Sequence, residues 1–116
     1  MERRITVEAF FAAATDRHEG ERVHLHGHTY RVRATTVAES DPTLQAHLQA
    51  VAGELDLRRL EDMIVGGSTD LFGIASWFLE RLIMAHQGIV EIEMTEDPFW
   101  RNATITVVRT LRSPVR

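Results

Sequence analysis

The chain has 116 residues, of which 44% are hydrophobic and 26% are charged, as expected for one globular domain over residues 1–116. The 17 acidic residues outnumber the 13 basic ones, so the net charge of -4 argues against a nucleic-acid partner. No apolar run is long enough to span a bilayer and no signal peptide opens the chain, so we expect a cytoplasmic protein without a membrane partner. Because cysteine and lysine are both absent, thiolate chemistry, cysteine-ligated zinc and Schiff bases are excluded.

The N-terminal third predicts two strands. Alternation of apolar and polar residues over 4–11 puts Ile5, Val7 and Phe11 on one face, which is typical of a half-buried strand. Polar residues 16–21 read as a loop, and residues 23–37, rich in Val, Thr and Tyr, predict the second strand.

The middle of the chain predicts two helices separated by Gly66-Gly67. Apolar residues recur at helical spacing from position 44, so we expect a helix over 42–53, with Asp41 as its N-cap and Gly53 as an interruption; a short hairpin is the alternative there. The second helix should begin at a Ser68 or Thr69 cap and end near residue 88.

Two further strands are expected at the C-terminal end, over 90–95 and 103–109, joined by a turn through Asp97-Pro98. The order strand, strand, helix, helix, strand, strand indicates an α+β fold in which two antiparallel pairs form a sheet and both helices pack on one of its faces. The two free edges of such a sheet favour pairing with further copies, so we expect a homo-oligomer.

The most informative segment for chemistry carries three histidines at every second position. His24, His26 and His28 should point to one face of their strand, with neighbouring Cα atoms about 6.6 Å apart, so that two imidazoles could share a metal ion. Three in one strand span too far to ligate together, so a third ligand would have to come from elsewhere. Exposed histidines without a metal show the same spacing, and this alternative stays open.

The segment His26-Gly27-His28-Thr29-Tyr30, preceded by Leu25 and by Phe10-Phe11-Ala12-Ala13, resembles the 6-pyruvoyl- and 6-carboxy-tetrahydropterin synthase family. That family consists of zinc lyases of the tunnelling fold (T-fold) that act on dihydroneopterin triphosphate. The resemblance implies two strands, two helices and two strands assembled into a ring, here a trimer or hexamer, with the substrate between subunits.

Several catalytic residues of that family have no counterpart here. Its first zinc histidine falls on Ala14, its catalytic cysteine falls on Arg22, and its Asp-His pair is missing between Ile64 and Ser68. Because general acids and bases are worth about 10²–10⁴-fold each, their joint loss leaves no visible route to the family's reaction.

The ligand-binding residues are changed as well. The glutamate that anchors the pterin ring falls on Met94, although the neighbouring Thr95 is kept. The resemblance therefore implies a different ligand, with Arg22, Met94 and Thr95 as candidate binding residues. Zinc remains an open alternative with His26, His28 and a third ligand from His18, and no organic cofactor is evident.

We therefore expect a repurposed lyase, cyclase or isomerase acting on a small cyclic metabolite in a specialised biosynthetic pathway. Its small-molecule substrate would bind in a pocket between subunits, with His26, His28, Tyr30 and Glu96 as catalytic candidates. Two alternatives stay open: a catalytically silent ligand-binding or partner subunit, and a genuine zinc-dependent synthase whose lost groups are replaced by relocated ones.

Overall fold

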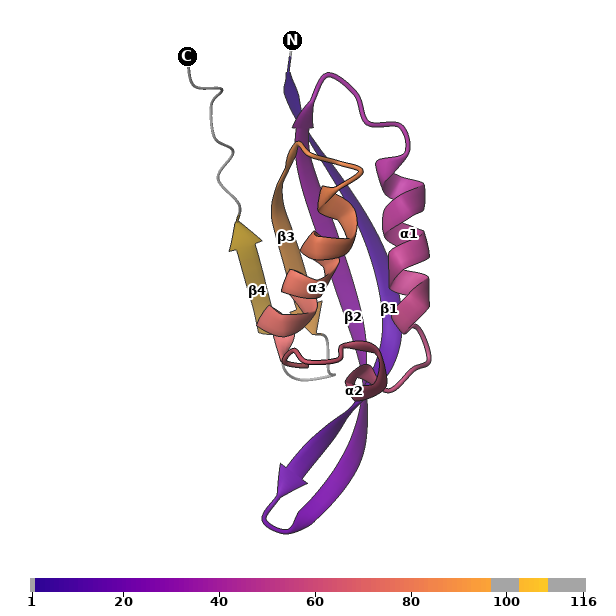
Figure 1. Cartoon of the computed structure of the whole chain (residues 1–116), viewed down its shortest axis with the longest axis vertical. Coiled ribbons are helices and arrows are strands. Elements are labelled where there is room, and N and C mark those ends of the chain that lie inside the picture. Colours follow the sequence, from indigo (N-terminus) through magenta and orange to yellow (C-terminus); the bar gives the residue numbers. More distant parts are fainter. Residues whose placement is uncertain (1, 97–102, 109–116) are drawn as a thin grey trace.

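A computed structural model describes residues 2–96 and 103–108 of the chain. One antiparallel sheet has the strand order β1-β2-β3-β4, and its helices lie on one face (Figure 1). The elements in chain order are β1 Arg3–Glu19, β2 Arg22–Ala38, α1 Leu44–Leu55, α2 Leu60–Met63, α3 Leu71–Ile83, β3 Ile89–Glu96 and β4 Ala103–Val108. This architecture confirms the predicted α+β fold. In the described part of the chain, no helix is both long and apolar enough to cross a membrane.

The core lies between the sheet and the two longer helices. Alternate residues in the middle of β1 and β2 are buried in the core beneath the helices, which confirms the period-two pattern found in the sequence: Ala9, Phe11 and Ala13 in β1, and Tyr30, Val32 and Ala34 in β2. The Phe11 ring stacks on Tyr30 with centroids 5.0 Å apart and lies 5.7 Å from Phe78 of α3. These aromatic contacts fix the sheet face immediately next to the histidine-bearing part of β2.

The segment expected to be a loop at residues 16–21 is mostly strand. β1 continues to Glu19 and pairs residue by residue with β2 as far as Arg22, so that only a tight turn at Gly20 separates the strands. Gly20 has φ +62, a conformation that glycine adopts without steric cost. Residues 16–25 form a two-stranded ribbon, here called the hairpin arm, which extends beyond the helices (Figure 1). Backbone pairing holds this polar segment extended. A pattern of apolar residues cannot predict such pairing, which is why the segment was expected to be a loop.

The helix boundaries differ from the sequence prediction at their caps. α1 begins at Leu44 after an N-cap at Thr43, not at Asp41, and Gly53 lies within the helix without interrupting it. The N-cap of α3 is Asp70, whose carboxylate accepts a hydrogen bond from Gly73 N at 2.8 Å. Ser68 and Thr69 precede that cap, and the C-terminal end of α3 is at Ile83 rather than near residue 88.

The connection from α1 to α3 also contains a short helix, α2, that the apolar spacing did not resolve. Within this connection Leu57 is exposed with φ +60, whereas Leu60 and Ile64 are buried. β3 and β4 match the expected strands closely. The predicted turn through Asp97-Pro98 and the expected strand end at Arg109 lie outside the described residues.

Candidate functional site

A hollow of about 280 Å³ opens where the hairpin arm leaves the sheet, beside the N-terminal end of α3. β2 supplies three of its lining residues, and β1, the end of β3 and the start of α3 with the two residues before it supply the others. Its lining residues are Thr15, Asp16, His26, His28, Tyr30, Thr69, Asp70, Leu71 and Glu96. The hollow therefore gathers all four residues predicted from the sequence to be catalytic.

The strand register explains how His28 and Glu96 meet. Tyr30 of β2 pairs with Glu96, the last residue of β3, so β2 continues past the end of its neighbour. His28 lies two residues before Tyr30 in the sequence, on the same face of β2 and beyond the end of β3. Its Nδ1 is 3.0 Å from Glu96 Oε1. Both side chains are about one-quarter exposed, at 21% and 27%. An imidazole held in this way by a carboxylate has its second nitrogen free to accept a proton.

The histidines of β2 follow one another along this face, as predicted. The His26 and His28 rings are 6.4 Å apart between centroids and nearly parallel, with an interplanar angle of 15°. His24 is exposed, 6.2 Å from His26, and does not line the hollow. His26 and His28 therefore lie side by side in the site.

Tyr30 closes the inner end of the hollow. Its side chain is buried, with an exposed fraction of 2%, and its ring lies 6.1 Å from His28 between centroids. Burial, followed by the negative charges of Glu96 and Glu61, raises the pKa of the Tyr30 phenol well above its usual value. Tyr30 therefore keeps its proton at neutral pH and is able to donate a hydrogen bond.

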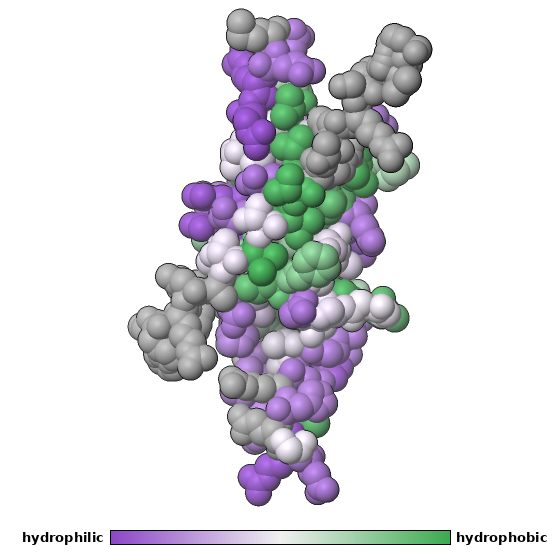
Figure 2. Space-filling model, turned by 90° about the vertical axis from the view of Figure 1, so that its left-hand side faces the viewer, coloured by the Kyte–Doolittle hydropathy of each residue, from purple (hydrophilic) through white to green (hydrophobic). Residues whose placement is uncertain are grey.

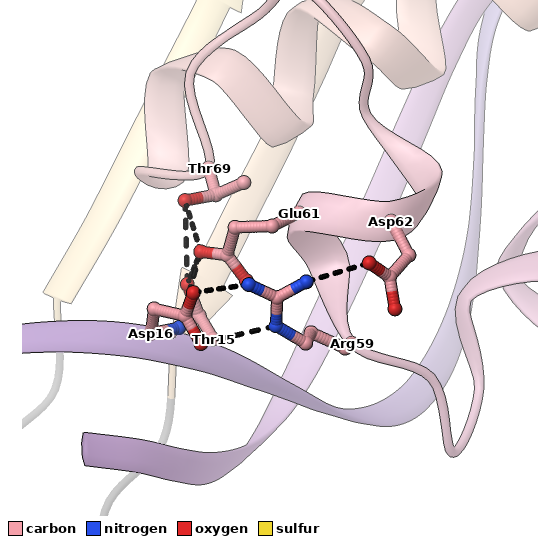
Figure 3. A network of polar contacts seen from close by, with 6 residues as sticks. All are labelled: Thr15, Asp16, Arg59, Glu61, Asp62 and Thr69. Carbon is pink, nitrogen blue, oxygen red and sulfur yellow. Dashed lines mark hydrogen bonds and ion pairs between the residues drawn. The ribbon is translucent and has the colours of Figure 1, made fainter. Parts of the chain in front are cut away.

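A second group of polar residues supports another part of the lining, and no pattern in the sequence predicts it (Figure 3). Glu61 Oε2 accepts hydrogen bonds from Thr15 Oγ1 at 2.5 Å, Thr69 Oγ1 at 3.0 Å and the Asp16 amide at 3.1 Å. Burial raises the pKa of Glu61, but these hydrogen bonds lower it by more, so the carboxyl stays ionised. Thr15 and Glu61 are 46 residues apart, and no local pattern connects them.

Arg59 fixes the base of the hairpin arm in the same group. Its guanidinium donates from Nε to Asp16 Oδ1 at 3.1 Å and from a second nitrogen to Asp16 Oδ2 (Figure 3). A further hydrogen bond joins Arg59 to Asp62 at 2.6 Å. The hydrogen bond from Arg59 lowers the pKa of Asp16, against a smaller opposing effect of burial. Asp16 is thus a compensated charge at the edge of the hollow.

The other candidates from the sequence lie elsewhere. Arg22 is exposed at the turn of the hairpin arm, and Met94 is fully buried in the core. Thr95 lies on the opposite face of the sheet, where its hydroxyl is 3.2 Å from that of Thr104. His18 lines a neighbouring hollow with Glu61 rather than the one that contains His28. None of these four lines the described hollow.

The side chains around His26 and His28 do not form a set of ligands that fits a zinc ion. Within residues 2–96 and 103–108, no group of three or more His, Asp or Glu side chains is placed to hold a metal. Ala14 pairs with Gly27, whereas Thr15 pairs with His26, so the β1 residue that faces His26 is Thr15. A threonine hydroxyl already bonded to Glu61 is a poor replacement for an imidazole ligand.

The α+β fold is similar to the fold of solved tetrahydropterin synthases. A 6-pyruvoyl tetrahydropterin synthase from Caenorhabditis elegans has a TM-score of 0.70 at 17% identity, over 95% of this chain and 97% of that one. The enzyme from Plasmodium vivax, solved with a catalytic glutamate replaced by alanine, has a TM-score of 0.62 at 14% identity, over 94% and 99%. No family model matches the chain, and no curated protein matches it in sequence. At these identities the likeness shows the T-fold alone.

Proposed function

We propose that this protein is related to the pterin synthases and has been repurposed as a lyase, cyclase or isomerase that moves a proton on a small cyclic metabolite. The observation that carries the proposal is the 3.0 Å contact between His28 Nδ1 and Glu96 Oε1 at the wall of a hollow. The fold supports a pterin-synthase-related function. The catalytic glutamate of the Plasmodium vivax enzyme is a precedent, on this fold, for a carboxylate in the chemistry.

The proposed chemistry depends on the tautomer of His28. Because a carboxylate has no proton to donate, the proposal places the proton of a neutral His28 on Nδ1, 3.0 Å from Glu96 Oε1, and leaves the lone pair of Nε2 free as a general base. Nε2 would take a proton from a carbon next to a C=N or C=O bond. The electron pair of the C–H bond would form a C=C bond, and the π pair of the C=N or C=O bond would move to its heteroatom. Tyr30, which keeps its proton, would donate a hydrogen bond to the heteroatom on which charge develops. Return of the proton to another position completes an isomerisation, and loss of a leaving group completes a lyase step.

Hydrogen exchange tests this assignment without knowledge of the product. The protein is incubated in D2O with 6-aminomethyl-7,8-dihydropterin, whose aminomethyl carbon next to the ring C=N bears an exchangeable proton, and deuterium uptake is measured by mass spectrometry. The wild type is expected to catalyse uptake, and His28→Ala is expected to lower the rate about 10²–10⁴-fold. His24→Ala, a matched change on the same strand outside the hollow, should leave the rate unchanged.

Each other outcome contradicts the proposal. Equal uptake with wild type and His28→Ala would remove His28 from the chemistry. Binding of the probe without any exchange would favour the silent binding subunit instead. Turnover of dihydroneopterin triphosphate would identify a genuine synthase and refute the repurposing.

A homo-oligomer, either a trimer or a hexamer, is part of the same proposal. β1 and β4 are the edges of the sheet among the described strands, and an edge strand can pair with a further copy. The outer side of β1 is already bonded at Ala12 and Ala14 to residues 56–58, so β4 is the edge expected to pair. Figure 2 shows apolar surface gathered into a band on the side where β4 forms the edge, and β4 carries the exposed Ile105 and Val108. Light scattering should give a mass of three or six chains at micromolar concentration, and a monomer would refute this part.

A further inference from the structure

The two threonine hydroxyls at the wall of the hollow offer only acceptors to a ligand. Thr15 and Thr69 each have one hydroxyl proton, and both donate toward Glu61 Oε2, at 2.5 and 3.0 Å. Their oxygens are 3.3 Å apart, so a bond between them would also keep the protons within the group. Because Glu61 is ionised, neither proton is available to the hollow. A ligand must therefore donate at this wall.

The charged residues that line the hollow also favour a ligand that donates hydrogen bonds and carries positive charge. Three carboxylates, those of Asp16, Asp70 and Glu96, line the hollow, and no arginine is among the lining residues that the structure describes. Arg59 compensates Asp16, but Asp70 and Glu96 have no arginine in the interactions described. The sequence contains no lysine that could supply a cation instead.

The positive end of α3 does not reverse this balance. Leu71 starts the helix at the edge of the hollow, and a helix N-terminus is equivalent to roughly half a positive charge. Asp70, as the N-cap, places a full negative charge there and takes the Gly73 amide at 2.8 Å. The end of the helix is therefore already neutralised, and a phosphate would find no free positive site.

We propose that the hollow takes an unphosphorylated small ring carrying a primary amine, and that it rejects phosphorylated ligands. The ammonium group would donate to the oxygens of Thr15 and Thr69, which lie close enough to share one donor group. Glu96 and Asp70 would supply the negative potential, and a phosphate would be repelled by the same carboxylates. This inference rests on the proposed function, because it names the substrate class of the same site.

Three closely related probes separate the two parts of the proposal. Pyridoxamine carries a ring and a primary amine, pyridoxine has a hydroxyl in place of the amine, and pyridoxamine 5′-phosphate adds the phosphate. Their dissociation constants for the wild-type protein are measured by calorimetry at pH 7.5, with amide chemical shifts to locate binding. Pyridoxamine is expected to bind about tenfold more tightly than either of the other two and to shift the amides of residues 69–71.

A matched pair of variants tests the threonine wall. Thr69→Val removes one acceptor and should weaken pyridoxamine about fivefold. Thr106→Val is the same change at an exposed position of β4 outside the hollow, and it should leave affinity unchanged. If Thr69→Val does not fold, the comparison of the three probes on the wild type still decides the question.

The binding measurements test the ligand class, and the deuterium-exchange measurement tests the role of His28, so one proposal can fail while the other stands. Affinity for pyridoxamine 5′-phosphate equal to or above that for pyridoxamine would overturn the exclusion of phosphate. Equal binding of pyridoxine, or no saturable binding of pyridoxamine, would overturn the amine. An absence of deuterium exchange would contradict only the role of His28, because the calorimetric and chemical-shift measurements of binding do not depend on turnover.

Discussion

His86 donates a hydrogen bond from Nδ1 to Asp41 Oδ2 across 2.7 Å, beyond the end of α3 that lies away from the hollow. The direction is fixed because a carboxylate cannot donate. With Nδ1 protonated, the Nε2 of a neutral His86 accepts from His47 Nδ1 at 2.9 Å. Three segments are joined in this way: the connection before α1, α1 itself and the connection before β3. His86 is buried, with an exposed fraction of 5%, so the contact is a structural link rather than a surface pair.

Replacing Asp41 should therefore weaken the fold. Asp41→Ala leaves a buried imidazole N–H without an acceptor, which is expected to cost about 1–3 kcal/mol in the free energy of unfolding. Asp41→Asn retains an acceptor oxygen and should cost less. Urea denaturation measures both, and an Asp41→Ala midpoint equal to that of the wild type would show that the link carries no stability.

Two helical glycines should respond to alanine in opposite directions. A Cβ at Gly53 meets nothing within 4 Å, so Gly53→Ala should stabilise α1 by about 0.5–1 kcal/mol. A Cβ at Gly73 would lie 2.0 Å from Ser68 O, so Gly73→Ala must displace the connection that carries Thr69. Thermal unfolding of the two variants compares them directly. Stabilisation by Gly73→Ala would mean that this close approach is not present in solution.

The positions of the strands and longer helices were predictable because each has an apolar face with its own period. The core residues Phe11, Val32 and Phe78 are all at positions that those periods mark. The hairpin arm was missed because its residues are polar and its order comes from backbone pairing. The cap of α3 was assigned one or two positions too early because serine, threonine and aspartate are all good N-caps.

Of the residues that line the hollow, the sequence predicted those on one face of β2 and Glu96 at the end of β3. Alternation in β2 was enough to bring His26, His28 and Tyr30 to one face, and the adjacent strand supplied Glu96. Nothing in the local sequence relates Glu61 to Thr15, since the pair depends on how the connection after α1 folds back against β1. Contacts of this kind require the tertiary structure.

Acid should weaken the attachment of the hairpin arm to α2. The pKa values of Glu61 and Asp16 are both lowered in the folded state, so their contribution to stability is complete above the ordinary carboxyl range, near pH 4–4.5, and is lost as the pH falls through the lowered values. Denaturation midpoints between pH 2 and 7 should fall more steeply for the wild type than for Glu61→Gln. Glu54→Gln, at an exposed ion pair with Arg81, is the matched control and should keep the wild-type slope.

Zinc content provides an independent test of the site. The described residues supply two imidazoles and no third convergent donor, so we expect the purified protein to contain well below one zinc per chain. Elemental analysis after expression in zinc-supplemented medium makes the measurement. One zinc per chain, lost in both His26→Ala and His28→Ala, would revive the zinc-dependent alternative and require a third ligand from His18 or from another subunit.

The tautomer of His28 is the most direct physical test of the proposed base. Glu96 Oε1 is 3.0 Å from Nδ1, so the neutral ring should carry its proton on Nδ1 and present Nε2 as an acceptor. Long-range proton–nitrogen correlation spectra distinguish the two tautomers, and they are expected to show the Nδ1–H form for His28. In Glu96→Gln the side chain can donate or accept, so the preference should relax toward a mixture while the His47 and His86 signals stay unchanged. An Nε2–H tautomer in the wild type would leave no free base pointing away from Glu96, and the proton-transfer role of His28 would then be untenable.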